Sequence, residues 1–332
     1  MKITAPTRID LAGGTLDIFP LYVFENGGLT VNMAIDLFTE VDITQRSDTQ
    51  INIYSSDLGT EKSAANIRDL ESGGELDLII RAIKFFNPPF GMDIKTKSSV
   101  PKGSGLAASS SILVALMTGL SKLCLKSADP HNFIDWCANV EAQSLGIPTG
   151  KQDYYAAYFG GISAIKFLAS GIEHENIKLS RTSIRKISES IILSFTGISH
   201  FSGTNNWNMT KSYIDGNPLT KKSMKQIKET SLQMLQAIEK ESLKDIAEAL
   251  NREWENRKQL AEGVTNEKID KIMSEAKKQG ALASKICGAG GGGCMITLCN
   301  TENKASISQA ITNAGAQILN FDISLEGVKI GE

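Results

Sequence analysis

"PKGSGLAASSSILVAL", residues 101–116, decides the fold. A strand-like run precedes it, and the apolar run that continues to residue 125 has the length and composition of a helix. Gly103 and Gly105 let backbone N–H groups approach a ligand closely, and the start of a helix presents unpaired N–H donors with a partial positive charge. The stretch therefore predicts an anion-binding loop. The alternative reading is that the serines at 109–111 are only helix caps.

A second glycine-rich segment, "KICGAGGGGCMI" (285–296), lies between an expected helix and an expected strand. Its apolar flanks are unusual for a linker, so residues 288–293 are expected to let the backbone approach a ligand or another loop. A glycine-rich turn without a ligand is the alternative. A Walker A sequence is absent from the chain. Gly103, Gly105 and Ala108 fit the loose dinucleotide pattern, but no second strand follows where that fold needs one.

Composition bounds the class of protein. The 332 residues suggest two packed units, and 41% hydrophobic with 22% charged residues is ordinary for a globular chain. The net charge of -2 argues against a nucleic-acid partner bound through bulk charge. No signal-peptide pattern and no run of about 20 apolar residues is present, so we predict a cytoplasmic protein without a membrane partner. The five cysteines form no CxxC pair and are expected to be free thiols.

Periodicity predicts the order of elements. Strands are expected at 29–45, 51–56, 161–167, 190–197, 293–299 and 316–324. Helices are expected at 75–86, 109–125, 130–146, 152–160, 266–280 and 304–315, with a lysine- and glutamate-rich helical region at 223–263. The strand–helix–strand ending predicts a small α+β second domain.

Two acidic residues stand out between the glycine-rich segments. Asp153 follows "IPTGKQ" at an expected loop-to-helix junction, where an aspartate is often only an N-cap. Glu141 lies on the preceding expected helix, where it is most often a solvated charge. As a hard oxygen ligand, Glu141 could instead hold magnesium together with a hydroxyl such as that of Ser109. The residues alone leave these readings open.

Three stretches in this order resemble the GHMP kinases, the family named for galactokinase, homoserine kinase, mevalonate kinase and phosphomevalonate kinase. They are "APTRIDLAGGTLD" (5–17), "PKGSGLAASSSILVAL" (101–116) and "KICGAGGGGCMI" (285–296). The resemblance spans nearly the whole chain and implies an α+β, two-domain fold. Residues 1–178 would form a ribosomal protein S5 domain 2-like, ATP-binding domain, and residues 179–332 a ferredoxin-like domain.

The resemblance also implies roles for individual residues. Asp153 matches the catalytic aspartate, and Arg8 the basic residue that supports it. Asp17 matches a carboxylate that binds sugar hydroxyls, and Ser109 with Glu141 the magnesium-coordinating pair. The loop that wraps the ATP phosphates comprises Gly103, Ser104, Gly105, Leu106, Ala107, Ala108, Ser109 and Ser110. The third motif comprises Gly288, Ala289, Gly290, Gly291 and Gly292, of which Gly288, Gly290 and Gly291 are expected at the substrate.

Within the family, "RIDLAGGTLDIFP", "GIPTGKQDYYAAYFGGISAIKF" and "SFTGISHFS" resemble the kinases of D-glycero-D-manno-heptose 7-phosphate. The resemblance implies an ATP- and Mg²⁺-dependent sugar kinase acting on the anomeric hydroxyl of that sugar. The alternatives are a kinase of a free hexose such as galactose or fucose, a kinase of a mevalonate-like alcohol, and a non-catalytic nucleotide-binding protein. A small-molecule sugar or sugar phosphate is the expected partner, and a monomer or homodimer the expected state.

Some positions depart from the family pattern. Ala107 and Ala108 stand where glycine and serine are usual, which removes one phosphate-facing hydroxyl. Gly14 takes the place of a galactokinase-type glutamate, which counts against galactose. A heptose 7-phosphate also needs a basic pocket for its own phosphate. The candidates for that pocket are Lys102, Lys151 and His200.

Overall fold

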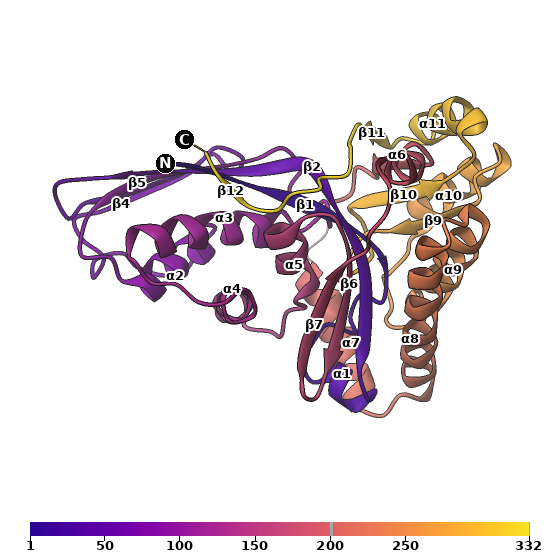
Figure 1. Cartoon of the computed structure of the whole chain (residues 1–332), viewed down its shortest axis with the longest axis horizontal. Coiled ribbons are helices and arrows are strands. Elements are labelled where there is room, and N and C mark those ends of the chain that lie inside the picture. The colour runs from indigo at the N-terminus through magenta and orange to yellow at the C-terminus, as the bar shows by residue number, and fades with distance from the viewer. Residues whose placement is uncertain (200–201, 332) are drawn as a thin grey trace.

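The computed structural model describes residues 1–199 and 202–331, which form two sheets with their helices (Figure 1). The larger sheet has the order β12-β1-β2-β5-β3-β4, and β6 and β7 branch from β2. Its strands are β1 (Lys2–Ala12), β2 (Gly28–Gln45), β3 (Ile51–Ser55), β4 (Thr60–Ala64), β5 (Met92–Ser98), β6 (Ile162–Leu168), β7 (Gly171–Asn176) and β12 (Lys329–Ile330). The expected strands of this half are confirmed.

The long strand β2 organises the larger sheet. It pairs with β1 along its length, with β6 at Gly28–Met33 and with β5 at Thr39–Gln45. Four helices cover one face of this sheet (Figure 1). They are α2 (Asp77–Phe86), α3 (Ala108–Leu123), α4 (Pro130–Leu145) and α5 (Gln152–Phe159). The short helix α1 (Leu21–Phe24) lies beside β6 at the far end.

Helix α3 is central to this half. It is apolar almost all round because it lies between the sheet and the helices α2, α4 and α5. Leu113, Val114, Leu116 and Met117 are fully buried. This packing fixes the start of α3, and with it the loop that precedes the helix.

The smaller sheet has the order β11-β8-β10-β9 with every pair antiparallel. Its strands are β8 (Ile191–Phe195), β9 (Ala283–Ile286), β10 (Cys294–Leu298) and β11 (Gln317–Leu319). Its helices are α6 (Arg181–Glu189), α7 (Ser202–Ile214), α8 (Pro218–Glu239), α9 (Leu243–Arg257), α10 (Glu267–Lys278) and α11 (Lys304–Asn313), with a 3₁₀ turn η1 at Thr301–Asn303. Strands β9 and β10 form a hairpin, and helices connect this hairpin to β8 before it and to β11 after it. This is the ferredoxin-like arrangement, so the expectation of an α+β fold is confirmed.

The last residues return to the larger sheet. Strand β11 ends at Leu319, well short of the strand expected at 316–324. The chain there leaves β8 and runs along β2, where Asp36 N donates to Asp322 O and Ser324 N donates to Ala34 O, both at 2.9 Å. Strand β12 then pairs with β1. The expectation of one long strand was therefore partly wrong, because the backbone partner changes from β8 to β2.

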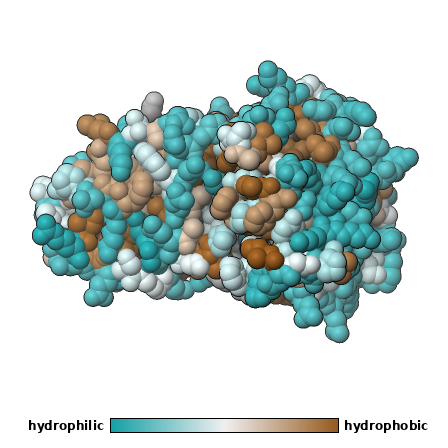
Figure 2. Space-filling model, turned by 90° about the horizontal axis from the view of Figure 1, so that it is seen from below, coloured by the Kyte–Doolittle hydropathy of each residue, from teal (hydrophilic) through white to brown (hydrophobic). Residues whose placement is uncertain are grey.

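The face shown in Figure 2 is mainly hydrophilic, with apolar side chains in small groups between the polar ones. Phe19, Phe24 and Ile214 are among the more exposed large apolar residues. Within residues 1–199 and 202–331, no helix combines the length and apolar character that a membrane span requires. The cysteines are free thiols, as expected, and four of the five are buried.

Candidate active site

A cavity of about 500 Å³ lies where the two halves of the chain meet. One wall is built by β1, the loop before α3, and the segment from α4 into α5. The other wall comes from α7, the end of α9 and the loop between β9 and β10. Two of the three family-like motifs therefore meet the third across a single cavity, although residues 18–284 separate the first motif from the last.

The loop before α3 has the backbone of an anion site. Gly103, Gly105 and Ala107 are left-handed, with φ of 71°, 70° and 66°, so left-handed residues alternate along the loop. Such alternation turns successive N–H groups toward one concave side. None of the described side chains caps α3, so the reading of the serines as caps is wrong. The loop and the first turn of α3 offer free N–H donors to an anion.

Most of this loop lines the cavity. The lining residues of the loop are Lys102, Gly103, Ser104, Gly105, Ala107, Ala108, Ser109 and Ser110. Leu106 is fully buried instead, and its carbonyl accepts a hydrogen bond from Arg8 N at 3.0 Å. Leu106 therefore anchors the loop to β1, while its neighbours face the cavity.

Ala107 occupies a conformation that glycine adopts at no cost, so it offers a stability test. We expect Ala107→Gly to raise the free energy of unfolding by up to about 1 kcal/mol, because it relieves left-handed strain. Ala108→Gly, one residue on at the start of α3, should lower it by about 0.5 kcal/mol. Urea denaturation of both variants measures the two changes. Shifts of the same sign would contradict the strain at Ala107.

The glycines of the third motif pack against the loop before α3. Cys294 N donates to Ser104 O at 2.6 Å, and a Cβ on Gly293 would lie 2.6 Å from that same oxygen. A Cβ on Gly105 would lie 2.7 Å from the carbonyl oxygen of Cys287. The sequence predicted that this segment approaches either a ligand or another loop. The structure shows a close approach to the loop before α3.

The third motif reaches the cavity at one end only. Gly288 and Ala289 line the cavity. Gly290 and Gly291 lie behind it, where Gly291 N donates to Val264 O at 2.7 Å and a Cβ on Gly290 would lie 2.6 Å from Val264 Cγ1. The geometry thus supports Gly288 as a substrate contact and gives no support to Gly290 or Gly291.

Arg8 and Asp153 form an ion pair in the middle of the cavity wall. Arg8 Nε donates to Asp153 Oδ1 at 2.7 Å, Nη2 lies 2.7 Å from the same oxygen, and Nη1 donates to Gly105 O at 2.6 Å. Burial opposes the charge of Arg8, but the Asp153 and Asp10 carboxylates outweigh it and hold the pKa of Arg8 above its usual range. The Arg8 guanidinium therefore connects the Asp153 carboxylate to the loop before α3, through Gly105 O.

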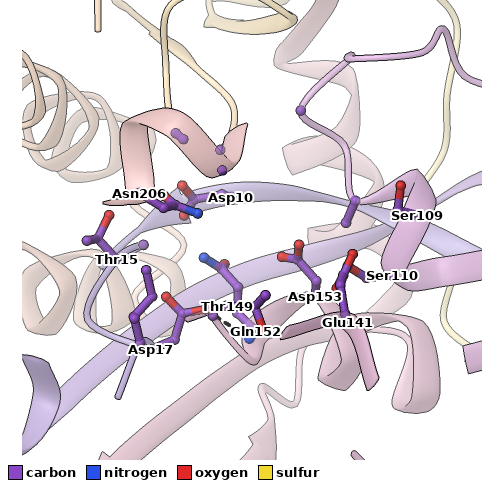
Figure 3. Close-up of a pocket in the computed structure, with 18 of the residues that line it drawn as sticks. Asp10, Thr15, Asp17, Ser109, Ser110, Glu141, Thr149, Gln152, Asp153 and Asn206 are labelled. Carbon is purple, nitrogen blue, oxygen red and sulfur yellow. Dashed lines mark hydrogen bonds between the residues drawn. The ribbon is translucent and has the colours of Figure 1, made fainter. Parts of the chain in front are cut away.

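Asp153 lies in the first turn of α5 and does not cap it, so the N-cap reading is wrong. Its Oδ2 has no hydrogen-bond partner among the described residues, and the side chain lines the cavity (Figure 3). Oδ2 is therefore a carboxylate oxygen available to a bound molecule.

Glu141 lies beside Asp153 and next to the start of α3 (Figure 3). Its Oε2 accepts hydrogen bonds from Ser110 Oγ at 2.9 Å and from the hydroxyl of Tyr154. Burial raises the pKa of Glu141 to about 7 despite these hydrogen bonds. Ser109 is exposed at the cavity, so the structure brings Ser110, and not the expected Ser109, into contact with Glu141.

Polar side chains gather at the other end of the cavity. Asp10, Thr15, Asp17, Gln152 and Asn206 lie around it (Figure 3). Of these, the sequence indicated only Asp17. The signal that could have indicated Asp10 is its place two residues after Arg8 on β1, which puts both side chains on one face of the strand.

Asp17 is almost fully buried, with 2% of its surface exposed. Its Oδ2 accepts a hydrogen bond from Gln152 N at 3.1 Å. Burial, with a smaller contribution from Asp153, raises the pKa of Asp17 from 3.8 to about 6. A carboxylate with few donors around it has spare capacity to accept hydrogen bonds from a hydroxylated ligand.

The raised pKa of Asp17 predicts a pH-dependent stability change. The buried charge destabilises the native state above about pH 6, and the penalty fades as pH falls toward the unfolded-state pKa of 3.8. Asp17→Asn should therefore stabilise the protein by up to about 3 kcal/mol at pH 8 and by much less near pH 4. Urea denaturation at both pH values tests this, with exposed Asp57→Asn as control. A pH-independent difference would contradict the buried charge.

Comparison with known proteins agrees with this arrangement. The model for the GHMP kinases N terminal domain matches residues 77–161, and that for the GHMP kinases C terminal region matches residues 234–317, together about half of the chain. The fold and the site thus define a phosphotransferase that uses ATP as donor and an alcohol as acceptor. The chain belongs to the GHMP kinase family, which confirms the resemblance and the two-part fold it implied.

Individual relatives are similar over the whole chain. The D-glycero-alpha-D-manno-heptose 7-phosphate kinase of Campylobacter jejuni is 27% identical and is matched over 99% of this chain and 98% of its own. A crystal structure of a D-glycero-D-manno-heptose 1-phosphate kinase from Bacteroides thetaiotaomicron superposes with a TM-score of 0.80 at 26% identity, covering 100% and 99% of the two chains. The galactokinase of Pyrococcus furiosus is 24% identical over 94% and 92%.

Proposed function

We propose that this chain is a sugar kinase that transfers the γ-phosphate of ATP to the anomeric hydroxyl of D-glycero-D-manno-heptose 7-phosphate. The observation that carries the proposal is the Arg8–Asp153 pair, which lies between an anion-binding loop and an end of the cavity lined with polar side chains. The similarity to a heptose 7-phosphate kinase over 99% of the chain supports the choice of sugar.

The proposed reaction assigns separate tasks to the loop before α3, to Asp153 and to Arg8. The N–H groups of Gly103, Gly105 and Ala107 and of the first turn of α3 hold the ATP phosphates, whereas those of Ser104 and Leu106 donate within the loop. Asp153 Oδ2 orients the sugar hydroxyl and accepts its proton as the phosphoryl group transfers. Arg8 holds Oδ1 of the same carboxylate at 2.7 Å, so the base is fixed against the phosphate loop. Positioning and charge neutralisation supply most of the catalysis in such a transfer.

Glu141, Ser109 and Ser110 fit a Mg²⁺ ion. All three offer hard oxygen ligands beside the phosphate loop, as Mg²⁺ prefers. The pKa of buried Glu141 lies near 7, which marks a carboxylate whose burial a nearby cation would offset. When bound, Mg²⁺ neutralises charge on the transferring phosphates. Ser110 and Tyr154 hold Glu141 in place through hydrogen bonds to Oε2.

The lining of the acceptor end favours a neutral, hydroxyl-rich group. Asp10, Asp17, Gln152 and Asn206 can accept or donate hydrogen bonds to sugar hydroxyls. The carboxylate of a mevalonate-like acceptor would meet the Asp17 carboxylate, which has no cation paired with it among the described residues, and be repelled. A glutamate at position 14 would not fit either, because even a Cβ there would lie 2.8 Å from Asp10 Oδ2. These features argue for a sugar and against the galactose-binding arrangement.

The phosphate already carried by the sugar needs a cation. Lys102 lines the cavity and pairs with Glu75 at the surface, at 2.7 Å. Lys151 pairs with Asp135 at 2.6 Å and is not part of the cavity lining, and His200 lies outside the described residues. Lys102 belongs to the loop before α3, at the ATP end of the cavity, so we assign neither lysine to the phosphate of the sugar. The reaction needs no membrane or nucleic-acid partner, and we expect a cytoplasmic monomer or homodimer.

ADP release with ATP and Mg²⁺ across a panel of acceptors tests the proposed function. The panel is heptose 7-phosphate, the free heptose, mannose, galactose, fucose and mevalonate, with a reaction lacking acceptor as the blank. We expect the highest kcat/KM with heptose 7-phosphate. A higher kcat/KM with another acceptor would show that this acceptor, and not heptose 7-phosphate, is the preferred substrate. ATP binding without turnover of any acceptor would favour the non-catalytic alternative.

A further inference from the structure

Arg257, the last residue of α9, connects the two sides of the acceptor end. Its side chain is 1% exposed and lines the cavity. Nη2 donates to Gly14 O at 2.9 Å, and Nη1 donates to Thr15 Oγ1 at 3.3 Å and to Gly288 O at 3.5 Å. One guanidinium from the C-terminal half therefore contacts the loop after β1 and the loop after β9. None of the three family-like motifs contains Arg257.

Buried charges around Arg257 hold it in place. Its Nη2 lies 2.6 Å from Oε1 of Glu253, one turn earlier on α9, and 4.0 Å from Asp10 Oδ2. Lys285 Nζ donates to Asp10 Oδ2 and to Asp10 O, both at 2.9 Å. All four side chains are at most 1% exposed. Two cations and two carboxylates offset each other, so the charge of Arg257 is already balanced within the protein.

The loop that Arg257 contacts needs an external support. Thr15 has φ of 79°, a left-handed conformation that is strained for a β-branched residue. Gly14 lets the loop approach Arg257, because a Cβ there would lie 3.0 Å from Nη2. Two residues after Thr15 the same loop carries Asp17, whose Oδ2 accepts a hydrogen bond from Gln152 N. Holding residues 14 and 15 therefore also holds Asp17 against α5.

We infer that Arg257 is a positioning residue of the acceptor site, which fixes the loop carrying Asp17 and so sets the affinity for the acceptor. It acts through Gly14, Thr15 and Gly288, and it neither contacts the reacting atoms nor binds the phosphate of the sugar. The inference rests on the proposed function only in taking the Asp17 end of the cavity as the acceptor site. The phosphate loop of ATP lies at the opposite end, so the affinity for ATP should not depend on Arg257.

Steady-state kinetics of two Arg257 variants test the inference. Arg257→Lys keeps the charge but cannot reach both loops in a forked geometry. We expect the acceptor KM to rise about 10- to 100-fold, as for loss of one or two hydrogen bonds from a charged group, while kcat and the KM for ATP change by less than about threefold. Arg252→Lys is the matched control, because Arg252 is an exposed arginine of the same helix. It should leave all parameters unchanged.

The double variant Arg257→Met with Glu253→Leu guards against misfolding, because it removes both buried partners together. We expect the same rise in acceptor KM, with thermal unfolding and ATP affinity close to the wild type. An unchanged acceptor KM in this folded variant would overturn the inference. A rise in the KM of ATP as large as that of the acceptor would also overturn it.

A pair of acceptors separates positioning from phosphate binding. The variants should lose the same factor with heptose 7-phosphate and with the free heptose. A loss confined to the phosphorylated sugar would mean that Arg257 binds phosphate, and would overturn the inference. The series uses whichever acceptor the wild type phosphorylates best, so failure of the heptose assignment leaves the test of Arg257 intact.

Discussion

Asp153→Asn is expected to lower kcat by about a thousandfold or more, with little change in the KM for ATP. Asparagine can still accept the hydrogen bond from Arg8 Nε, so the local geometry is kept while the proton-accepting charge is lost. The neighbouring ion pair between Lys151 and Asp135 provides the control. Asp135→Asn removes a carboxylate of the same region that does not line the cavity, and should reduce kcat by less than about threefold.

Steady-state kinetics of these two variants, with far-ultraviolet circular dichroism to check the fold, measure the effect. Undiminished turnover in Asp153→Asn would remove Asp153 from the role of base. Equal losses in the two variants would point to a general effect of removing negative charge from this part of the chain.

Gly293→Ala should have the second largest effect, because it alters two loops at once. Gly293 has φ of 81°, and a Cβ there would lie 2.6 Å from Ser104 O and 3.1 Å from Gly103 O. The added methyl group must push the loop before α3 toward the cavity. We expect the free energy of unfolding to fall by about 2–4 kcal/mol through strain and overpacking. The KM for ATP should rise at least about 10-fold as the N–H groups lose their alignment.

The variant Gly216→Ala separates backbone strain from overpacking, the two causes of the effect expected in Gly293→Ala. Gly216 has φ of 84°, almost the same as Gly293, but no atom lies within 4 Å of a Cβ placed on it. Gly216→Ala should therefore lower the free energy of unfolding by only about 1 kcal/mol, through backbone strain, and should leave ATP binding unchanged. Urea denaturation and ATP titration of both variants provide the comparison. Indistinguishable variants would mean that contact between the two glycine-rich loops does not shape the ATP site.

The features that the sequence predicted well depend on local pattern. The glycines of "PKGSGLAASSS" before an apolar run predicted an anion-binding loop at the start of a helix, and residues 103–107 form a loop of alternating left-handed residues directly before α3. Most expected helices and strands are present within a few residues of their predicted bounds. The approach of Arg8 to Asp153, 145 residues apart, was expected only from family resemblance, since no local pattern links the two.

The features that the sequence missed depend on how elements pack. Whether Ser109 or Ser110 faces Glu141 is decided by the rotation of α3 against α4, and the structure selects Ser110 for the hydrogen bond. Tyr154 reaches Glu141 because α5 crosses α4 at that point. Arg257 reaches Gly14 over 243 positions of sequence, from a region whose lysine- and glutamate-rich pattern predicted helix but no site residue. The return of the last residues to β1 was likewise set by tertiary pairing.

The proposed reaction transfers phosphate from ATP to the anomeric hydroxyl of a heptose 7-phosphate. Phosphorus NMR of a reaction containing protein, ATP, Mg²⁺ and heptose 7-phosphate tests it most directly. We expect the γ-phosphate signal of ATP to be replaced by a second sugar-phosphate signal coupled to the anomeric proton, and we expect this signal to be absent with Asp153→Asn. A new phosphate signal coupled to any other sugar proton, or ADP formed together with inorganic phosphate alone, would contradict it.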